Sequence, residues 1–244
     1  MEFLNEIINS LNAGKIDEVI QKITDFLNQN SEYKTIDYYH FSNPLEELLF
    51  SVYIDNGEVK TLGMDEPLDE IYHIYSIAHA VKGDFESSLK YLKIANQINP
   101  VSAPILMKLC ETYQQMHQEE KLIDYVCDIF KYAYDRELLI SNYFKLADYY
   151  FHTNQKLELY DHLFNFFLFL KSGDEEKPVK DDIKYFKKHN VPVGFNEEII
   201  SMLLYLIDVH NKQGMPNAAE YFKNMLKDIV EFNKSLNDIE PISD

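Results

Sequence analysis

Two histidines that follow a carboxylate by four residues are the clearest candidates for chemistry in this sequence. Asp148 precedes His152, and Glu158 precedes His162. On a helix this spacing places both side chains on one face, so a metal site is geometrically possible. No third ligand stands at motif spacing, and a solvated ion pair or a capped imidazole explains the same residues. We therefore predict no metal site, and we keep a metal-binding or enzymatic helical domain built on Asp148, His152 and His162 as an alternative.

The sequence lacks the motifs that mark several large enzyme classes. It contains no GxxxxGK phosphate loop, no GxGxxG after a strand, no GxSxG elbow and no HExxH helix. Its two cysteines, Cys110 and Cys127, have no CxxC spacing, and we expect both thiols to be reduced and packed. We predict that the protein is not an enzyme, with no catalytic residue and no cofactor.

The net charge argues against two classes of partner. The 244 residues include 41 acidic and 23 basic side chains, which give a formal net charge of −18 at pH 7. Such a charge repels nucleic acids and anionic membranes. The chain starts without the basic and apolar segments of a secretory signal, and its most apolar stretch, 163–170, is far shorter than the roughly 20 residues that span a bilayer. We expect a cytoplasmic protein that binds neither nucleic acid nor membrane.

Basic residues gather at one place only. This patch contains Lys177, Lys180, Lys184, Lys187 and Lys188. We expect these side chains to form the solvated face of a short helix near 181–189. Docking of an acidic partner is the alternative.

Apolar residues recur three and four positions apart along most of the chain, which predicts amphipathic helices. The first two helices are expected at 2–11 and 16–29, with Gly14 in the turn between them. The pair Asn43-Pro44 provides a cap and a first helical residue, so another helix should begin there. Residues 58–62 alternate weakly, which leaves a short strand or a loop as the two interpretations.

From residue 69 onward the sequence resembles the tetratricopeptide repeat (TPR) family. Bulky and small side chains occur where its 34-residue pattern requires them, and Pro100 closes the unit. The matching positions are the bulky Tyr72, Tyr75, His79 and Leu92 and the small Ser76, Ser88 and Ala95. Small residues let two helices approach closely, and bulky residues fill the space between successive pairs.

The repeat position that Ser76 occupies recurs at Cys110, Ala147 and Ile207. These residues follow one another, starting from Ser76, at intervals of 34, 37 and 60 residues. The last pair has its first helix predicted at 197–212, and it matches poorly except around Gly214 and Ala219. The Asn-Pro-Leu-Glu-Glu segment at 43–47 and the predicted turn Val-Pro-Val-Gly at 191–194 also give most of the chain a resemblance to an uncharacterised bacterial branch of the TPR family, which carries no known activity.

The resemblance implies an all-α fold, a right-handed α-solenoid of about five helix-turn-helix hairpins with an irregular insertion. The predicted organisation is an N-terminal helical hairpin at 1–32, an insertion with one helix and a possible short strand at 33–68, three TPR-like repeats at 69–171, a connector at 172–195, a C-terminal TPR-like hairpin at 196–232 and a polar tail at 233–244.

The resemblance also implies a binding groove on the concave face, lined by the first helix of each hairpin. In this sequence the groove residues are His73, Ile77, Met107, Lys108, Glu111, Gln114, Phe144, Lys145, Asp148, Phe151, His152, Tyr205, Asp208 and Asn211. Three of them, Glu111, Asp148 and Asp208, carry carboxylates that we expect to lie in a row along the groove. Such a row attracts a peptide with basic residues, and the aromatic residues of the groove bind its apolar residues.

We therefore expect a non-catalytic adaptor or scaffold that binds a peptide or protein segment in this groove. A homo-oligomeric structural module is a further alternative. Chaperone-binding members of the family use Lys and Asn at two positions that His73 and Ile77 occupy here. Capture of an acidic chaperone C-terminus is therefore not expected.

Overall fold

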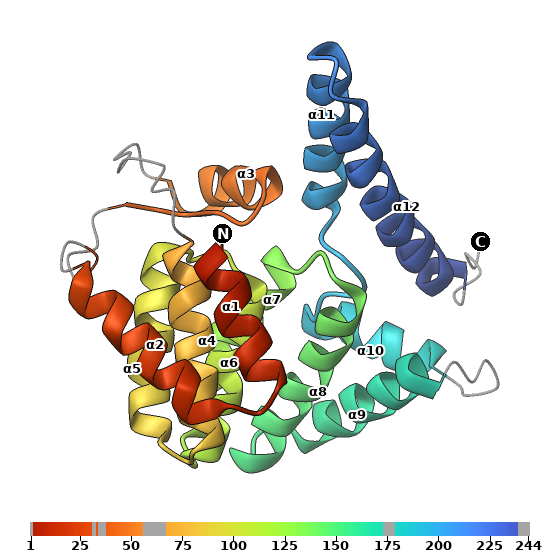
Figure 1. Ribbon diagram of the computed structural model, residues 1–244. Helices are drawn as coiled ribbons and strands as arrows, with labels where there is room; N and C mark the ends of the chain where they lie inside the picture. Colours follow the sequence, from red (N-terminus) through yellow and green to blue (C-terminus); the bar gives the residue numbers. More distant parts are fainter. Residues whose placement is uncertain (1, 31–32, 34–37, 56–66, 173–178, 239–244) are drawn as a thin grey trace. The chain divides into compact units, whose positions relative to one another are not determined.

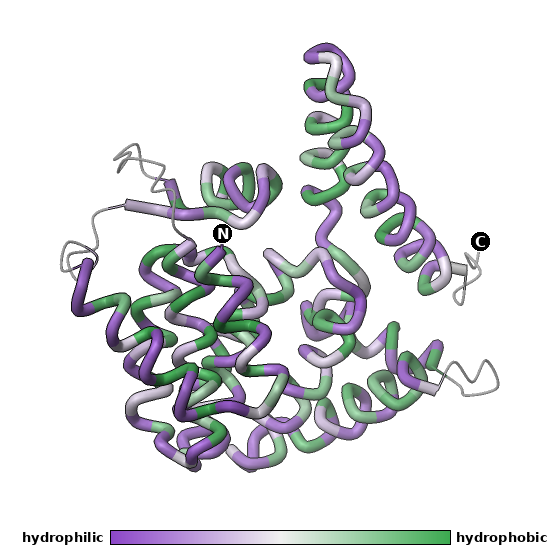
Figure 2. The backbone as a smooth tube through the Cα atoms, viewed as in Figure 1, coloured by the Kyte–Doolittle hydropathy of each residue, from purple (hydrophilic) through white to green (hydrophobic). Residues whose placement is uncertain are grey.

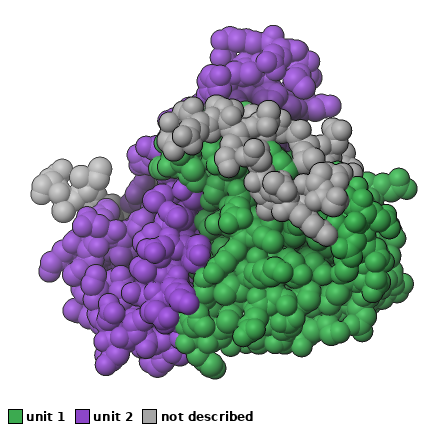
Figure 3. Space-filling view, turned by 90° about the vertical axis from the view of Figure 1, so that its left-hand side faces the viewer, with its two compact units in different colours: residues 1–118 green, residues 119–244 purple. Residues whose placement is uncertain are grey.

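The computed structural model describes residues 2–30, 33, 38–55, 67–172 and 179–238 of the chain (Figure 1). These residues form twelve α-helices and the short 3-10 helix η2, which confirms the all-α prediction. The chain divides into two compact units, Met1–Gln118 and Glu119–Asp244 (Figure 3). None of the described helices is long and apolar enough to cross a membrane.

Most neighbouring helices pack in adjacent pairs. The first unit contains α1 (Glu2–Asn12), α2 (Ile16–Gln29), α3 (Pro44–Tyr53), α4 (Leu68–Val81), α5 (Phe85–Ile98) and α6 (Ala103–Gln115). The second contains η2 (Glu119–Lys121), α7 (Leu122–Tyr132), α8 (Arg136–His152), α9 (Leu157–Ser172), α10 (Lys180–His189), α11 (Glu197–Lys212) and α12 (Pro216–Asp238). The pairs α1–α2, α4–α5, α8–α9 and α11–α12 pack along their lengths. Hydrophobic and hydrophilic residues alternate around each helix, as amphipathic periodicity predicts (Figure 2).

Five helices, α1, α4, α6, α8 and α11, end in the same turn. The second residue after each of them takes a left-handed conformation, at Gly14, Gly83, His117, Asn154 and Gly214. The next N–H then donates to a carbonyl five residues earlier, at 2.9–3.1 Å, as in a Schellman motif. Successive turns are separated by 34 residues from Gly83 to His117, by 37 from His117 to Asn154 and by 60 from Asn154 to Gly214. These are the intervals that the sequence pattern predicts.

The boundary between the two units falls inside the predicted second repeat. Its first helix, α6, belongs to the first unit, whereas η2 and α7 belong to the second. The block of three repeats predicted at 69–171 is therefore shared by the two units.

Small and aromatic side chains fill the α4–α5 pair. Ser76, Ser88 and Ala95, the predicted small positions, are fully buried. The rings of Tyr75 and Tyr91 stack with their centroids 4.1 Å apart. Because small residues at these positions remove steric barriers, the two helices can approach closely.

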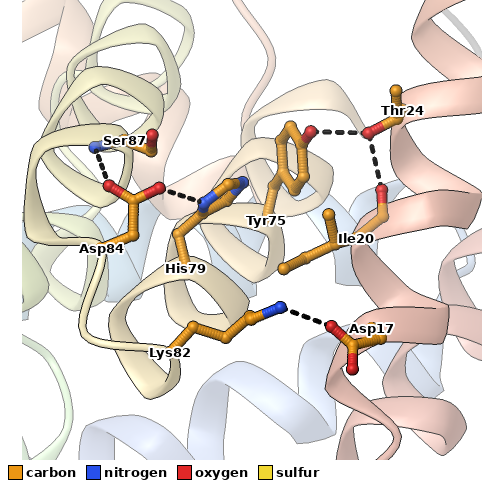
Figure 4. A network of polar contacts seen from close by, with 8 residues as sticks. All are labelled: Asp17, Ile20, Thr24, Tyr75, His79, Lys82, Asp84 and Ser87. Atoms are coloured by element: carbon orange, nitrogen blue, oxygen red, sulfur yellow. Dashed lines mark hydrogen bonds and ion pairs between the residues drawn. The ribbon is translucent and has the colours of Figure 1, made fainter.

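A polar network joins α2, α4 and the start of α5 (Figure 4). The Tyr75 hydroxyl lies 2.7 Å from that of Thr24 on α2. Nδ1 of His79 lies 3.0 Å from the Asp84 carboxylate, which also accepts from the Ser87 N–H at 3.1 Å. Asp84 therefore caps α5 and holds the last turn of α4 at the same time.

Helix α3 begins where the capping pattern predicts. The Asn43 side chain accepts hydrogen bonds from the N–H groups of Leu45 and Glu46, and Pro44 is the first helical residue. The Glu46 carboxylate in turn accepts from the Ser42 N–H at 2.8 Å. The strand predicted at 58–62 lies outside the described residues.

A buried polar cluster fastens α3 to the α4–α5 pair. The Asn99 amide donates to the carboxylates of Glu46 at 2.9 Å and Asp69 at 3.0 Å. All three residues are at most 2% exposed. Asp69 also lies 2.6 Å from Nδ1 of His40, and this contact raises the pKa of that imidazole. The shared amide satisfies two carboxylates that would be costly to bury unpaired.

Tyr143 links α8 to the segment between α10 and α11. Its ring is fully buried and packs edge-on against Phe130 and Phe166. Its hydroxyl donates to the Pro192 carbonyl at 3.0 Å and accepts from the Gly194 N–H at 2.9 Å. The predicted turn at 191–194 is thereby tied into the core of the second unit.

Helix α12 continues past the point where the polar tail was predicted to begin. Phe232 and Leu236 are buried, and the Asn233 side chain bonds both the N–H and the carbonyl of Phe195, at 2.7 and 3.0 Å. Apolar residues four positions apart keep this last turn against the core. The boundary predicted at 233 is therefore wrong, and the helix ends at Asp238.

Candidate functional site

The predicted groove residues of the first unit lie on α4 and α6. His73 and Ile77 on α4 are half-buried, and Lys108 and Glu111 on α6 form an ion pair. Burial, followed by the nearby Lys108 cation, lowers the pKa of His73 to about 4, and its Nε2 atom is buried without a hydrogen-bond partner among the described residues. His73 is therefore a neutral imidazole at neutral pH.

Two other predicted groove residues of α6 differ in exposure. Gln114 is half-buried and can reach a partner. Met107 is only 8% exposed and belongs to the core of the first unit. Met107 therefore offers almost no area for binding, in contrast to the groove prediction.

On α8 the predicted residues include a carboxylate and imidazole pair. Nε2 of His152 lies 3.3 Å from Oδ1 of Asp148, so the two groups are in contact, as their spacing predicts. Phe151 is 53% exposed, while Phe144 and Lys145 are half-buried. This segment of α8 thus presents one accessible aromatic ring beside a carboxylate and imidazole pair.

On α11 the predicted residues are all exposed. Tyr205 is 58% exposed, and Asp208 and Asn211 follow it on the same face of the helix. Nζ of Lys212 lies 2.6 Å from the Asp208 carboxylate. Helix α11 packs against α12, whereas α8 packs against α7 and α9. The α8 and α11 parts of the predicted groove thus stand on separate helix pairs.

The predicted row of carboxylates does not consist of free charges. Each member has its own basic neighbour, in the pairs Glu111 with Lys108, Asp148 with His152, and Asp208 with Lys212. The first pair lies in the first unit and the other two in the second. The cations of Lys108 and Lys212 partly neutralise the carboxylates of Glu111 and Asp208, which reduces the field that these two carboxylates offer to a charged partner.

An aromatic strip runs along the α8–α9 pair and is the most developed surface feature of the second unit. We define it as Phe144, Phe151, Tyr160, Phe164 and Phe167. The ring centroids of Phe151 and Tyr160 are 5.2 Å apart, those of Tyr160 and Phe164 are 5.8 Å apart, and those of Phe144 and Phe167 are 5.1 Å apart. Four of these rings are half-buried, and Phe151 is exposed. The strip is thus a row of mutually packed rings that solvent reaches.

The helical period of α9 places its rings in this strip. The fully buried residues Leu163 and Phe166 face the core. Tyr160, Phe164 and Phe167 are spaced by four and three residues, so they share a different face of the helix. The repeat pattern assigns groove positions to first helices only, so sequence reasoning named Phe144 and Phe151 but missed these three rings. Their spacing was the signal that could have revealed them.

The second candidate histidine pairs with a residue distant in sequence. Nδ1 of His162 lies 2.6 Å from Oδ1 of Asp182 on α10, and the His162 ring stacks on Tyr185 with the centroids 4.0 Å apart. Burial raises the pKa of Asp182 although the imidazole opposes this shift. In the part of the chain that the structure describes, no group of three or more His, Cys, Asp or Glu side chains could hold a metal ion.

The two thiols are both free, but they differ in environment. Cys110 is buried, as predicted, whereas Cys127 on α7 is exposed. Partial desolvation of the Cys127 thiol, reinforced by the nearby Asp128 carboxylate, raises its pKa. The prediction that both thiols are packed is therefore wrong for Cys127, because α7 turns this position away from its buried face.

No protein-family model matches the chain, and no curated protein matches it. A solved structure that is similar in part is the crystal structure of BtubC (BKLC) from P. vanneervenii, with 13% sequence identity and a TM-score of 0.39. The alignment covers 100% of this chain and 91% of that chain. At this TM-score the likeness carries no argument about fold or function.

Proposed function

We propose that the chain is a non-catalytic adaptor of the tetratricopeptide type, a right-handed α-solenoid of five helical hairpins that binds a peptide or protein segment. The five Schellman turns support this assignment, and the last four of them are spaced at the intervals of the sequence pattern. The buried small residues Ser76, Ser88 and Ala95 support it as well. Because fold class does not determine function, the proposal of binding depends on a surface.

The observation that carries the proposal is the aromatic strip. Phe151 is 53% exposed, and Leu157, which begins α9 after the intervening turn, is 49% exposed. A contiguous apolar surface of this kind is typical of protein-binding sites. Rings that already pack against one another lose little conformational freedom on binding, so they make effective anchors.

The charges near the strip favour a partner with basic residues beside apolar ones. Asp161 is exposed and follows Tyr160 on α9, while Asp148 lies on α8 between Phe144 and Phe151 in sequence. A segment that places an apolar side chain against Phe151 can bring a Lys or Arg close to these carboxylates. The net charge of −18 disfavours nucleic acids and anionic membranes as partners, and we propose that the protein acts in the cytoplasm.

Selection of peptides tests this proposal directly. Random twelve-residue peptides displayed on phage are selected on the wild-type protein, and the affinity of enriched peptides is measured by fluorescence anisotropy. We expect peptides that combine apolar and basic residues. Burial of the exposed half of Phe151, about 100 Å² at about 25 cal/mol per Å², corresponds to about 2.5 kcal/mol, so the double variant Phe151→Gln/Leu157→Gln should bind at least tenfold more weakly.

The matched control is Val52→Gln/Val81→Gln, which removes two apolar side chains that are 57% and 63% exposed in the first unit. Its affinity should stay within twofold of wild type, and circular dichroism should show that both variants fold. Equal affinities of the two variants, or a selection that enriches no peptide, would refute the strip as the binding surface.

The α11–α12 pair favours self-association as a second candidate function. Its exposed apolar residues are Leu204, Tyr205, Met215, Tyr221 and Val230, at 42–58% exposure. Light scattering after size-exclusion chromatography, over a hundredfold range of concentration, tests this alternative. A mass above 28.8 kDa that falls to the monomer value in Leu204→Gln/Tyr221→Ser would support it, and a constant monomer mass would exclude it.

A further inference from the structure

Nine lysines in the described part of the protein form an ion pair with a carboxylate. The pairs are Lys15 with Glu18, Lys22 with Glu6 and Glu18, Lys82 with Asp17, Lys108 with Glu111, Lys131 with Asp128, Lys171 with Glu137, Lys212 with Asp208, Lys223 with Glu220, and Lys227 with Glu231. An excess of acidic residues makes this arrangement easy to achieve. A second group of described lysines, which includes Lys90, Lys93 and Lys234, forms no ion pair with a described carboxylate.

Helix α10 carries three lysines of this second group. Lys180, Lys184 and Lys188 are exposed, and none of them lies within ion-pair distance of a carboxylate among the described residues. Their spacing of four residues places them on one side of the helix, and Lys187 lies beside them. We call Lys180, Lys184, Lys187 and Lys188 the lysine face.

Packing on the opposite side holds the lysine face in place. Ile183 and Phe186 are almost completely buried, and the Phe186 ring packs edge-on against Phe166 of α9 at 5.2 Å. Asp182 contacts His162 of α9 at 2.6 Å, so this acidic residue is occupied on the far side. The remaining acidic residue of α10 is the exposed Asp181. The helix therefore presents its cations from a fixed backbone.

Helix stability alone does not explain this arrangement. Cations near a helix C-terminus interact favourably with the helix dipole, which accounts for Lys187 and Lys188 in the last turn. Lys180 is the first residue of the helix, where the dipole disfavours a cation. Like charges four residues apart, such as Lys180 and Lys184, also destabilise a helix by about 0.2–0.5 kcal/mol.

We propose that the lysine face binds an acidic segment of a partner protein. A short acidic segment can contact these cations while the rest of the partner stays clear of the acidic surface. A membrane or a long nucleic acid extends beyond α10 and meets repulsion from a protein of net charge −18. This surface differs from the aromatic strip, which suits a basic and apolar segment, so the proposal goes beyond the adaptor function above.

The test uses the full chain and a fluorescein-labelled octaglutamate, with labelled octaserine as the control for the dye. Binding is followed by fluorescence anisotropy at 50 and 200 mM NaCl. The variant Lys180→Gln/Lys184→Gln/Lys188→Gln removes three unpaired cations. The control Lys131→Gln/Lys212→Gln/Lys223→Gln removes three exposed lysines that have carboxylate partners, so both variants change the net charge by the same amount.

We expect wild type to bind octaglutamate more weakly at the higher salt concentration, the lysine-face variant to bind at least tenfold more weakly than wild type, and the control to stay within twofold. All six lysines are exposed, so thermal unfolding should confirm that both variants fold. Equal loss in the two variants, or no binding by wild type, would overturn the proposal. Binding of phosphatidylserine vesicles or of oligothymidine through the same lysines, without binding of octaglutamate, would also overturn it and identify a membrane or a nucleic acid instead.

Discussion

Replacement of Tyr143 by Phe removes one hydroxyl from the core of the second unit and leaves the ring in place. The ring is 0% exposed and packs against Phe130, Phe166 and Phe186 with centroid separations of 5.1, 4.9 and 6.4 Å. Phe retains these contacts and creates no large cavity. The change therefore isolates the two hydrogen bonds of the hydroxyl.

Those two bonds set the expected loss of stability. The Gly194 N–H donates to the hydroxyl at 2.9 Å and belongs to a buried residue, so leaving it without this acceptor costs about 1–3 kcal/mol. The Pro192 carbonyl, at 3.0 Å, belongs to an exposed residue that water can reach, so its bond contributes only about 0.5–1.5 kcal/mol. We expect Tyr143→Phe to lower the free energy of unfolding by roughly 2–4 kcal/mol, a large share of typical domain stability.

Urea unfolding followed by circular dichroism measures this free energy, and hydrogen exchange reads the protection of the 191–196 amides. The matched control is Tyr205→Phe, which removes a hydroxyl from a ring that is 58% exposed and should change stability by less than about 0.5 kcal/mol. A loss below about 0.5 kcal/mol in Tyr143→Phe, with unchanged exchange at 191–196, would refute the role assigned to these hydrogen bonds.

Two further predictions concern buried polar groups of the first unit. The pKa of His73 is lowered from 6.5 to about 4 in the folded state, so the unfolded chain binds more protons between these two pH values. The free energy of unfolding should therefore fall by about 3 kcal/mol as the pH drops from about 6.5 to 4. In thermal unfolding, His73→Gln should remove most of this pH dependence, and an unchanged pH dependence would contradict the assignment. Asn99→Ala should cost about 3 kcal/mol because Glu46 and Asp69 lose their shared donor, whereas Gln97→Ala on the exposed side of α5 should cost less than about 0.5 kcal/mol. Equal denaturation midpoints for these two variants would argue against the cluster.

The positions of helices could be predicted because they follow from local patterns. Periodicity and caps predicted α2 and α11 with the bounds observed, and Asn43-Pro44 predicted the start of α3. The repeat interval anticipated even the turn at His117, where no glycine marks a left-handed residue. By contrast, the end of α12 depends on contacts of Asn233 with Phe195, 38 residues earlier, and no local signal reports such a contact.

The candidate site could be predicted only in part, because exposure depends on tertiary packing. The pattern selected Phe151 and Tyr205, which are exposed, but also Met107, which is buried. It paired His162 with Glu158 by spacing, whereas the structure places Asp182 of α10 next to the imidazole. Spacing along one helix predicts which of its own side chains can contact each other. It does not predict which side chains of a neighbouring helix will contact them.

Helix α9 lies between the two proposed surfaces. At about 100° per residue, Tyr160, Phe164 and Phe167 share one side of α9, and His162 and Phe166, which contact α10, lie roughly opposite. A rigid helix between them separates the aromatic strip from the lysine face, so one short segment cannot cover both. The aromatic strip is proposed to bind a basic segment and the lysine face an acidic one. A negative result in one binding test therefore leaves the other proposal unaffected. Loss of peptide binding through the strip would leave the lysine face as an independent site, and the reverse holds equally.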